Sequence, residues 1–311
     1  MSNANVPSID PLAPTSAGAS LHSRWMRTKS RIMFGVCVGY TVIILVLLAL
    51  VIGYLVSIGF SSISKAFFTL DPIPSGMAGA PGGMRNALIG TGVLIFLASL
   101  VGIPMGMLTG VYLAEYEVGS WFATPVRFVC DVLAGVPSIV VGILGYELVV
   151  RPLGNYNGWA GAMALAFIMV PIVARTTEEM LRLVPSSYRE ASIALGATKA
   201  VTILKVVIPS STASIVTGVM LAIARVAGET APLLFTALGS DYSPLTFGGS
   251  FPYIHASIGQ PFPSLTVQIF SYATHPNVKE QELAWAGILV LIGLIFVLNV
   301  CIRFATRTRR A

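Results

Sequence analysis

The feature that most constrains this chain is a series of long apolar runs that carry almost no charge. The first run covers residues 32–64 and contains no Asp, Glu, Lys or Arg. Arg31 and Lys65 flank it. About 20 apolar residues in a helix cross the hydrocarbon core of a bilayer. Residues 33–59 therefore predict a membrane-spanning helix. The run is longer than the apolar part of a signal peptide, so we interpret it as a retained helix.

Five further apolar runs predict five further spans. They cover residues 87–114, the segment between Arg127 and Arg151, residues 159–174, residues 211–238, and the segment between Glu282 and Arg303. The chain is therefore expected to be an all-α integral membrane protein with six transmembrane helices. In the outer loop, residues 264–272 predict a short helix that lies in the membrane interface.

The composition excludes several other classes of protein. Only 10% of the 311 residues are charged, whereas a soluble domain carries about 25%. Hydrophobic residues make up 55% of the chain. A soluble enzyme, a disordered protein and a fibrous protein are each inconsistent with these proportions.

The basic residues predict the orientation. Of the 19 Lys and Arg residues, fourteen fall on the side of the membrane that holds both termini, if six helices cross it. Cytoplasmic loops carry such an excess of positive charge, so both termini are expected in the cytoplasm. Because the charges lie at the ends of apolar runs, the net charge of +6 does not indicate nucleic-acid binding.

The predicted organisation has three parts. Residues 1–30 are expected to form a disordered cytoplasmic tail with a basic end, and residues 304–311 a short basic tail. Residues 31–303 form the six-helix domain, with its core at 85–303 and a cytoplasmic loop at 176–210.

The sequence offers no catalytic or metal site. It lacks the phosphate-binding pattern GxxxxGK[ST], and also GxSxG and HExxH. The three cysteines form no CxxC pair, and the three histidines lack ligand spacing. We therefore expect neither an enzyme nor a cofactor bound by this chain.

The loop at 176–210 is the most informative segment. Ser186 or Ser187 is expected to cap a short helix, with Glu190 completing a capping box and Gly196 ending it. Such a helix either lies on the membrane surface or fits a groove in a cytoplasmic partner.

This loop resembles the EAA loop of ABC-importer permeases, whose pattern is EAA-x3-G-x9-I-x-L-P. The residues that carry the resemblance are Glu190, Ala191, Ser192, Gly196, Val206, Ile208 and Pro209. Ser192, Val206 and Ile208 depart mildly from the pattern. Residues 133–142 (LAGVPSIVVG) and 225–237 (RVAGETAPLLFTA) resemble the corresponding stretches of phosphate-importer permeases. The three motifs cover roughly residues 85–240.

The resemblance implies a type I ABC-importer permease fold in the inner membrane and a role in ATP-driven phosphate import. It implies a homologous PstC-type permease subunit, two ATPase subunits that use the ATP, and an extracytoplasmic phosphate-binding protein, besides membrane lipid. Residues Arg189, Glu190, Ala191 and Gly196 would couple to the ATPase. The alternatives are a permease for phosphonate, sulfate or molybdate, and a secondary transporter.

Two charges are expected inside the membrane. Arg225 and Glu229 are four residues apart on the fifth predicted span and so share one face. Because a charge at the bilayer centre costs at least about 2.5 kcal/mol, this face should line the bundle interior. The pair either joins two helices or borders the solute path, together with Thr230 and Pro232.

The third span holds three further candidates, Asp131, Pro137 and Ser138. Each is interpreted as a structural or a pathway residue. Asp131 follows Arg127 by four residues, a spacing that favours an ion pair at the membrane surface, and Glu147 and Arg151 have the same spacing. Glu115 lies in a short inner loop and is expected to be solvated.

Overall fold

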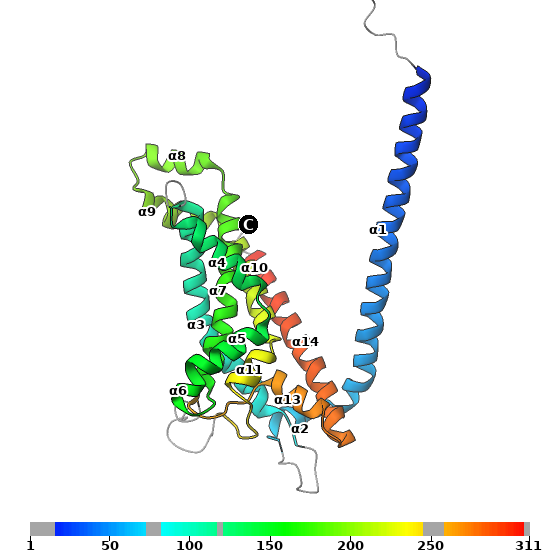
Figure 1. Cartoon of the computed structure of the whole chain (residues 1–311), viewed down its shortest axis with the longest axis vertical. Coiled ribbons are helices and arrows are strands. Elements are labelled where there is room, and N and C mark those ends of the chain that lie inside the picture. Colours follow the sequence, from blue (N-terminus) through cyan, green and yellow to red (C-terminus); the bar gives the residue numbers. More distant parts are fainter. Residues whose placement is uncertain (1–15, 73–81, 117–120, 245–257, 308–311) are drawn as a thin grey trace, which may run out of the picture. The chain divides into compact units, whose positions relative to one another are not determined.

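A computed structural model of the chain describes residues 16–72, 82–116, 121–244 and 258–307. Within these residues the chain is helical, apart from loops and one isolated bridge between Leu238 and Phe262, as Figure 1 shows. The expected all-α class is therefore confirmed. The chain divides into two units, residues 1–54 and residues 55–311.

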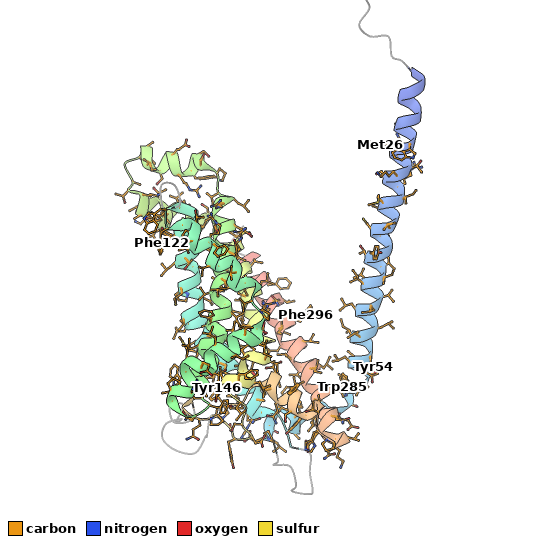
Figure 2. All side chains as sticks on the ribbon, viewed as in Figure 1. Met26, Tyr54, Phe122, Tyr146, Trp285 and Phe296 are labelled. Carbon is orange, nitrogen blue, oxygen red and sulfur yellow. The ribbon has the colours of Figure 1, made fainter. Side chains whose placement is uncertain are left out.

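The first helix, α1 (Ser16–Gly59), contains the first predicted span. Apolar side chains project from it between Met26 and Tyr54 (Figure 2), as expected for a helix that meets lipid. Residues 16–30 of the predicted tail are part of this helix, which begins at Ser16. No proline follows Pro14 until Pro72, so nothing stops the helix from propagating toward the N-terminus. Residues 1–15 lie outside the described residues.

Five helices in the described residues are long and apolar enough to cross a membrane. Two further helices are joined at a bend of 103° and together are long and apolar enough for a sixth crossing. The six predicted spans are thus present when the bent pair is counted as one span. The single helices cover Trp25–Ser62, Arg85–Glu115, Gly158–Arg182, Lys199–Ala227 and Val278–Val300, and the bent pair covers Ala123–Gly135 and Ser138–Leu153.

The second unit contains the remaining helices. The helices that make up its membrane crossings are α3 (Arg85–Glu115), α4 (Ala123–Gly135), α5 (Ser138–Gly145), α7 (Gly158–Arg182), α10 (Ile208–Ala227) and α14 (Val278–Arg307). Shorter helices are α2 (Lys65–Thr69), α6 (Arg151–Leu153), α8 (Ser186–Ala194), α9 (Lys199–Thr202), α11 (Ala231–Thr236) and α13 (Leu265–Ala273). π-Helical turns at Tyr146–Val150 and Ile203–Val207 join α5 to α6 and α9 to α10.

The centre of this unit is the seam between α3 and α7, which lie side by side in Figure 1. Glycines at positions 102, 106 and 110 recur every four residues and therefore face one side of α3. A methyl group on Gly106 would lie 2.6 Å from the Val173 Cβ atom. The absence of side chains at these positions lets the two helix backbones approach closely, as small residues do in other membrane proteins.

The two ends of this unit differ. Helices α8 and α9 lie at one end, toward which α14 runs, whereas α2, α6 and α13 lie at the opposite end (Figure 1). The loop that carries α8 and the end of α14 therefore share one side, as the predicted orientation requires. The predicted tail at 304–311 is helical up to Arg307, where α14 ends. Residues 308–311 lie outside the described part.

The predicted interface helix at residues 264–272 exists as α13, but its expected place is wrong. Leu265, Val267 and Tyr272 are buried by protein, and α13 packs against α14 and α3. The backbone N–H of Leu265 donates to the hydroxyl of Thr91 on α3. A helix with buried residues on several sides belongs to the packed core rather than to the membrane surface.

Candidate functional site

The site begins with the break in the third span. α4 ends at Gly135, Val136 is extended with a ψ of 132°, and Pro137 precedes the first residue of α5. A residue before proline avoids the helical conformation because the proline ring would clash with it, so the sequence places the bend at this point. Pro137 and Ser138, two of the predicted candidates, therefore form the corner of the broken span.

A second break lies where the fifth span was expected to continue. α10 ends at Ala227, and Gly228 caps it by donating its N–H to the carbonyls of Arg225 and Val226. The predicted helix to residue 238 is therefore wrong, and its predicted start at residue 211 is too late, since this span begins at Lys199. Proline lacks an N–H and fits the first turn of a helix, so Pro232 lies in the first turn of α11, which begins at Ala231, instead of continuing α10.

Arg225 and Glu229 still meet across this break. The Arg225 guanidinium lies 3.4 Å from the Glu229 carboxylate, and 54% of the arginine side chain is exposed. The backbone carbonyl of Glu229 accepts a hydrogen bond of 2.9 Å from Thr266 on α13. The carboxylate thus sits on a fixed backbone, while much of the guanidinium remains accessible.

A small cavity of about 10 Å³, which is room for roughly one water molecule, lies between Arg225 and the broken span. Its lining comprises Leu133, Ala134, Val136, Ser138, Ile168, Ile172 and Arg225. The two predicted groups, Arg225 of the fifth span and Ser138 of the third, therefore lie at one place. Ser138 and Arg225 are the polar residues of this lining, and the other lining residues are apolar. Arg225 therefore supplies the positive charge of the cavity.

The other predicted residues of this region, Thr230 and Pro232, lie at the start of α11. Pro232 is buried, and its Cα atom would lie 2.8 Å from a methyl group on Gly142 of α5. The Thr230 carbonyl accepts the N–H of Leu234 inside α11. The close approach of Pro232 to Gly142 places α11 against the second half of the broken span.

Asp131 lies at a different place, on α4 between Arg127 and the bend. Its carboxylate is 4.0 Å from Arg175 of α7. Arg127, its expected partner, donates bonds of 3.1 and 2.7 Å to Glu178 of α7. The predicted pair of Glu147 with Arg151 is present at 2.6 Å and is exposed.

The loop at 176–210 contains the predicted short helix, α8. Its N-cap is Pro185, without a side-chain bond, so the predicted serine cap and capping box are wrong. Gly196 has a φ of +85°, and the N–H of Ala197 donates to the Ser192 carbonyl, so the predicted glycine stop is confirmed. The helix presents Glu190 and Ala191 to its surroundings, and Leu195 beside it is 90% exposed.

Arg189 faces the opposite way from these exposed residues. Its guanidinium donates to Glu115 at the end of α3, with a shortest distance of 2.6 Å, and to the carbonyls of Leu181 and Val184. The prediction that Glu115 is solvated is wrong, because only 6% of its side chain is exposed. Arg189 therefore anchors α8 to the membrane-spanning helices.

The comparison with known proteins decides the family. Residues 102–310 match the family described as binding-protein-dependent transport system inner membrane component. The chain belongs to this family. It is thus an inner membrane permease, and the expected multi-pass location is confirmed.

Two relatives of this permease match it over almost their whole length. The phosphate transport system permease protein PstA of Yersinia pestis is 42% identical over 279 residues, which are 90% of each chain. PstA of Haemophilus influenzae is 38% identical, over 91% of this chain and 96% of the relative. An inward-facing structure of the MetNI methionine ABC transporter has a TM-score of 0.55 at 18% identity, covering 73% of this chain and 94% of its own. This similarity confirms the ABC-importer permease fold.

Sequence reasoning missed one residue of the permease, Glu178. Only 3% of its side chain is exposed, although it lies in a segment rich in charge. Arg175 precedes it by three residues and Arg182 follows it by four, and both carry guanidinium groups within 4 Å. That spacing could have revealed the cluster, since residues three and four apart share one face of a helix.

Proposed function

We propose that this chain is a membrane subunit of an ATP-driven importer of inorganic phosphate. The observation that carries the proposal is the 42% identity to a PstA permease over 90% of each chain. The motif residues Ser138 and Arg225, which carried the resemblance to phosphate permeases, line one cavity. The cavity holds only about one water molecule in this conformation, so passage of phosphate requires the cavity to widen, and Arg225 would then meet the anion.

Arg225 supplies the chemistry that such a path needs. A guanidinium presents several N–H donors in a plane and binds phosphate oxygens in pairs. Glu229 lies 3.4 Å away and competes for the same donors. We propose that Glu229 holds Arg225 in place and limits how tightly phosphate binds, because conduction requires a site weak enough to release the ion.

The proposed assembly has other subunits. This chain would pair with a homologous PstC-type permease subunit and receive phosphate from an extracytoplasmic phosphate-binding protein. Two ATPase subunits would bind the cytoplasmic loops. On this chain the docking surface would be the exposed side of α8 with Glu190, Ala191 and the Gly196 turn. Arg189 on the other side of α8 would keep the helix in place through its ion pair with Glu115. A surface position of α8 against lipid is the alternative.

Uptake of labelled phosphate tests the proposal. Cells that lack this chain but retain its partners should regain uptake when the chain is supplied. Arg225→Gln should reduce uptake strongly at equal membrane abundance, whereas Arg151→Gln should not, because Arg151 belongs to an exposed pair outside the cavity. Glu190→Arg should abolish ATP-dependent uptake while leaving membrane insertion intact.

Three results would argue against the proposal. Failure of the normal chain to restore phosphate uptake favours another oxyanion, which the same cells test with labelled sulfate or molybdate. Uptake that persists without ATP favours a secondary transporter. Full uptake by Arg225→Gln removes that residue from the path.

A further inference from the structure

Glu178 of α7 lies at the centre of an ion network that joins α7 to α4. One carboxylate oxygen accepts from Arg127 of α4 at 2.7 Å and lies 3.1 Å from Arg182, the last residue of α7. The other oxygen lies 3.7 Å from Arg175. Arg175 also bonds Glu179 at 2.9 Å and approaches Asp131.

The network balances its charges internally. Three arginines face the three carboxylates of Asp131, Glu178 and Glu179. Such a cluster leaves no surplus positive charge for an anion, so it does not form a second phosphate site. Glu178 is the buried member, and a buried carboxylate persists as an ion only when it is paired. Glu178 is therefore the carboxylate that Arg127 of α4 and Arg182 at the end of α7 share.

One side of the network connects to the cytoplasmic loop. Arg182 directly precedes the turn of residues 183–185 that leads into α8. Arg189 of α8 donates to the Leu181 carbonyl in the same final turn of α7. A displacement of α8 therefore acts on the helix end that Glu178 occupies.

The other side connects to the cavity. Arg127 lies in the first half of α4, and α4 packs along α7. The same helix ends at Gly135, and Ala134 and Val136 at this end line the cavity beside Arg225. Because α4 ends in a bend, its position relative to α7 determines where these lining residues lie.

We propose that Glu178 is a positioning residue that couples the loop helix α8 to the broken span. It transmits displacement of α8 through Arg182 and Arg127 to α4 and so to the cavity wall. The inference rests on the proposed function in that it assigns ATP-driven movement to α8. It assigns Glu178 no contact with phosphate or with the ATPase.

The variant Glu178→Gln tests this role, with Glu179→Gln as the matched control. Both changes remove one carboxylate charge from the same turn of α7, but 51% of the Glu179 side chain is exposed. A buried hydrogen bond from a charged donor to the Glu178 carboxylate contributes more free energy than an exposed ion pair such as that of Glu179. We therefore expect uptake per assembled complex to fall about tenfold or more in Glu178→Gln, and less than about twofold in Glu179→Gln.

Two further measurements separate coupling from folding. ATP hydrolysis by the purified complex should continue in Glu178→Gln, so that hydrolysis and uptake become uncoupled. In a complex carrying Ala134→Cys, a thiol reagent should label the introduced thiol at a rate that changes when ATP is bound, and Glu178→Gln should abolish that change. Arg127→Gln should have the same effect, and the double variant should be no worse than the more impaired single variant.

The outcomes are distinguishable. Normal uptake by Glu178→Gln overturns the inference, as does an ATP-dependent change in labelling that persists in this variant. A parallel loss of uptake, hydrolysis and complex abundance also overturns it, because it would assign Glu178 a role in folding alone. Failure of the normal chain to transport phosphate rejects the proposed function, but the labelling experiment still decides the role of Glu178, because it requires no phosphate.

Discussion

The seam between α3 and α7 predicts that one added methyl group destabilises the permease at Gly110 but not at Gly92. A Cβ atom at position 110 would lie 2.5 Å from the Ala174 carbonyl oxygen and 2.6 Å from the Thr177 Cβ atom. Nonbonded carbon atoms rest at about 3.5–4.0 Å, so the two helices must separate by about 1 Å. At position 92, on the same helix, nothing lies within 4 Å of the added atom.

The magnitudes follow from two opposing effects. Alanine stabilises a helix interior by about 1 kcal/mol relative to glycine. Overpacking costs about 1–3 kcal/mol, and a gap of about 0.5–1 Å along the seam forfeits roughly a quarter to a half of each dispersion contact. Gly110→Ala should therefore lower the free energy of unfolding by up to about 2 kcal/mol. Gly92→Ala should be neutral or raise it by about 1 kcal/mol.

Thermal unfolding of the purified complex in detergent, followed by circular dichroism, measures both variants under the same conditions. We expect Gly92→Ala to unfold at the same temperature as the unchanged protein or at a higher one. We expect Gly110→Ala to unfold at a lower temperature. Equal midpoints for the two variants would refute the reasoning, since they would mean that the backbones do not meet at Gly110. A lower midpoint for Gly92→Ala alone would refute it as well.

Three further predictions concern the loop and the outer surface. Gly196→Ala forces alanine into a left-handed conformation, which costs about 1–2 kcal/mol, so titration with the purified ATPase should show weaker binding to the permease. Arg189→Gln breaks the bonds to Glu115 and two carbonyls, and it should lower the unfolding midpoint, whereas Glu190→Gln should leave that midpoint unchanged. Glu147→Gln removes an exposed pair and should change the unfolding free energy by less than about 1 kcal/mol; a larger loss in the same thermal assay would contradict this assignment.

Much of the architecture was predictable because the bilayer imposes a simple requirement. Every backbone group in hydrocarbon must be bonded within its own helix, so uncharged runs of sufficient length had to be helices. The spans at 33–59 and 87–114 both lie inside observed helices for this reason. The glycine stop at Gly196 was also local, since it depends on backbone conformation alone.

The errors came where neighbouring segments overrule the local pattern. The apolar run through residue 238 resembles one helix, yet α10 ends before Gly228, and a new helix with Pro232 in its first turn packs against Gly142. α13 has the composition of an interfacial helix, but α3 and α14 bury it. Neither contact can be read from a segment in isolation.

The sequence by itself determined the class of this protein, its membrane-crossing runs and the motifs that connect it to permeases, because hydropathy and local backbone preference act within one segment. Only the tertiary structure decided which charges on different helices meet. Arg225 approaches the broken span, Arg189 turns inward to Glu115, and Glu178 gathers arginines from two helices. Arg189 and Glu115 are 74 residues apart along the chain, and Arg127 and Glu178 are 51 apart, so only helix packing brings these partners together.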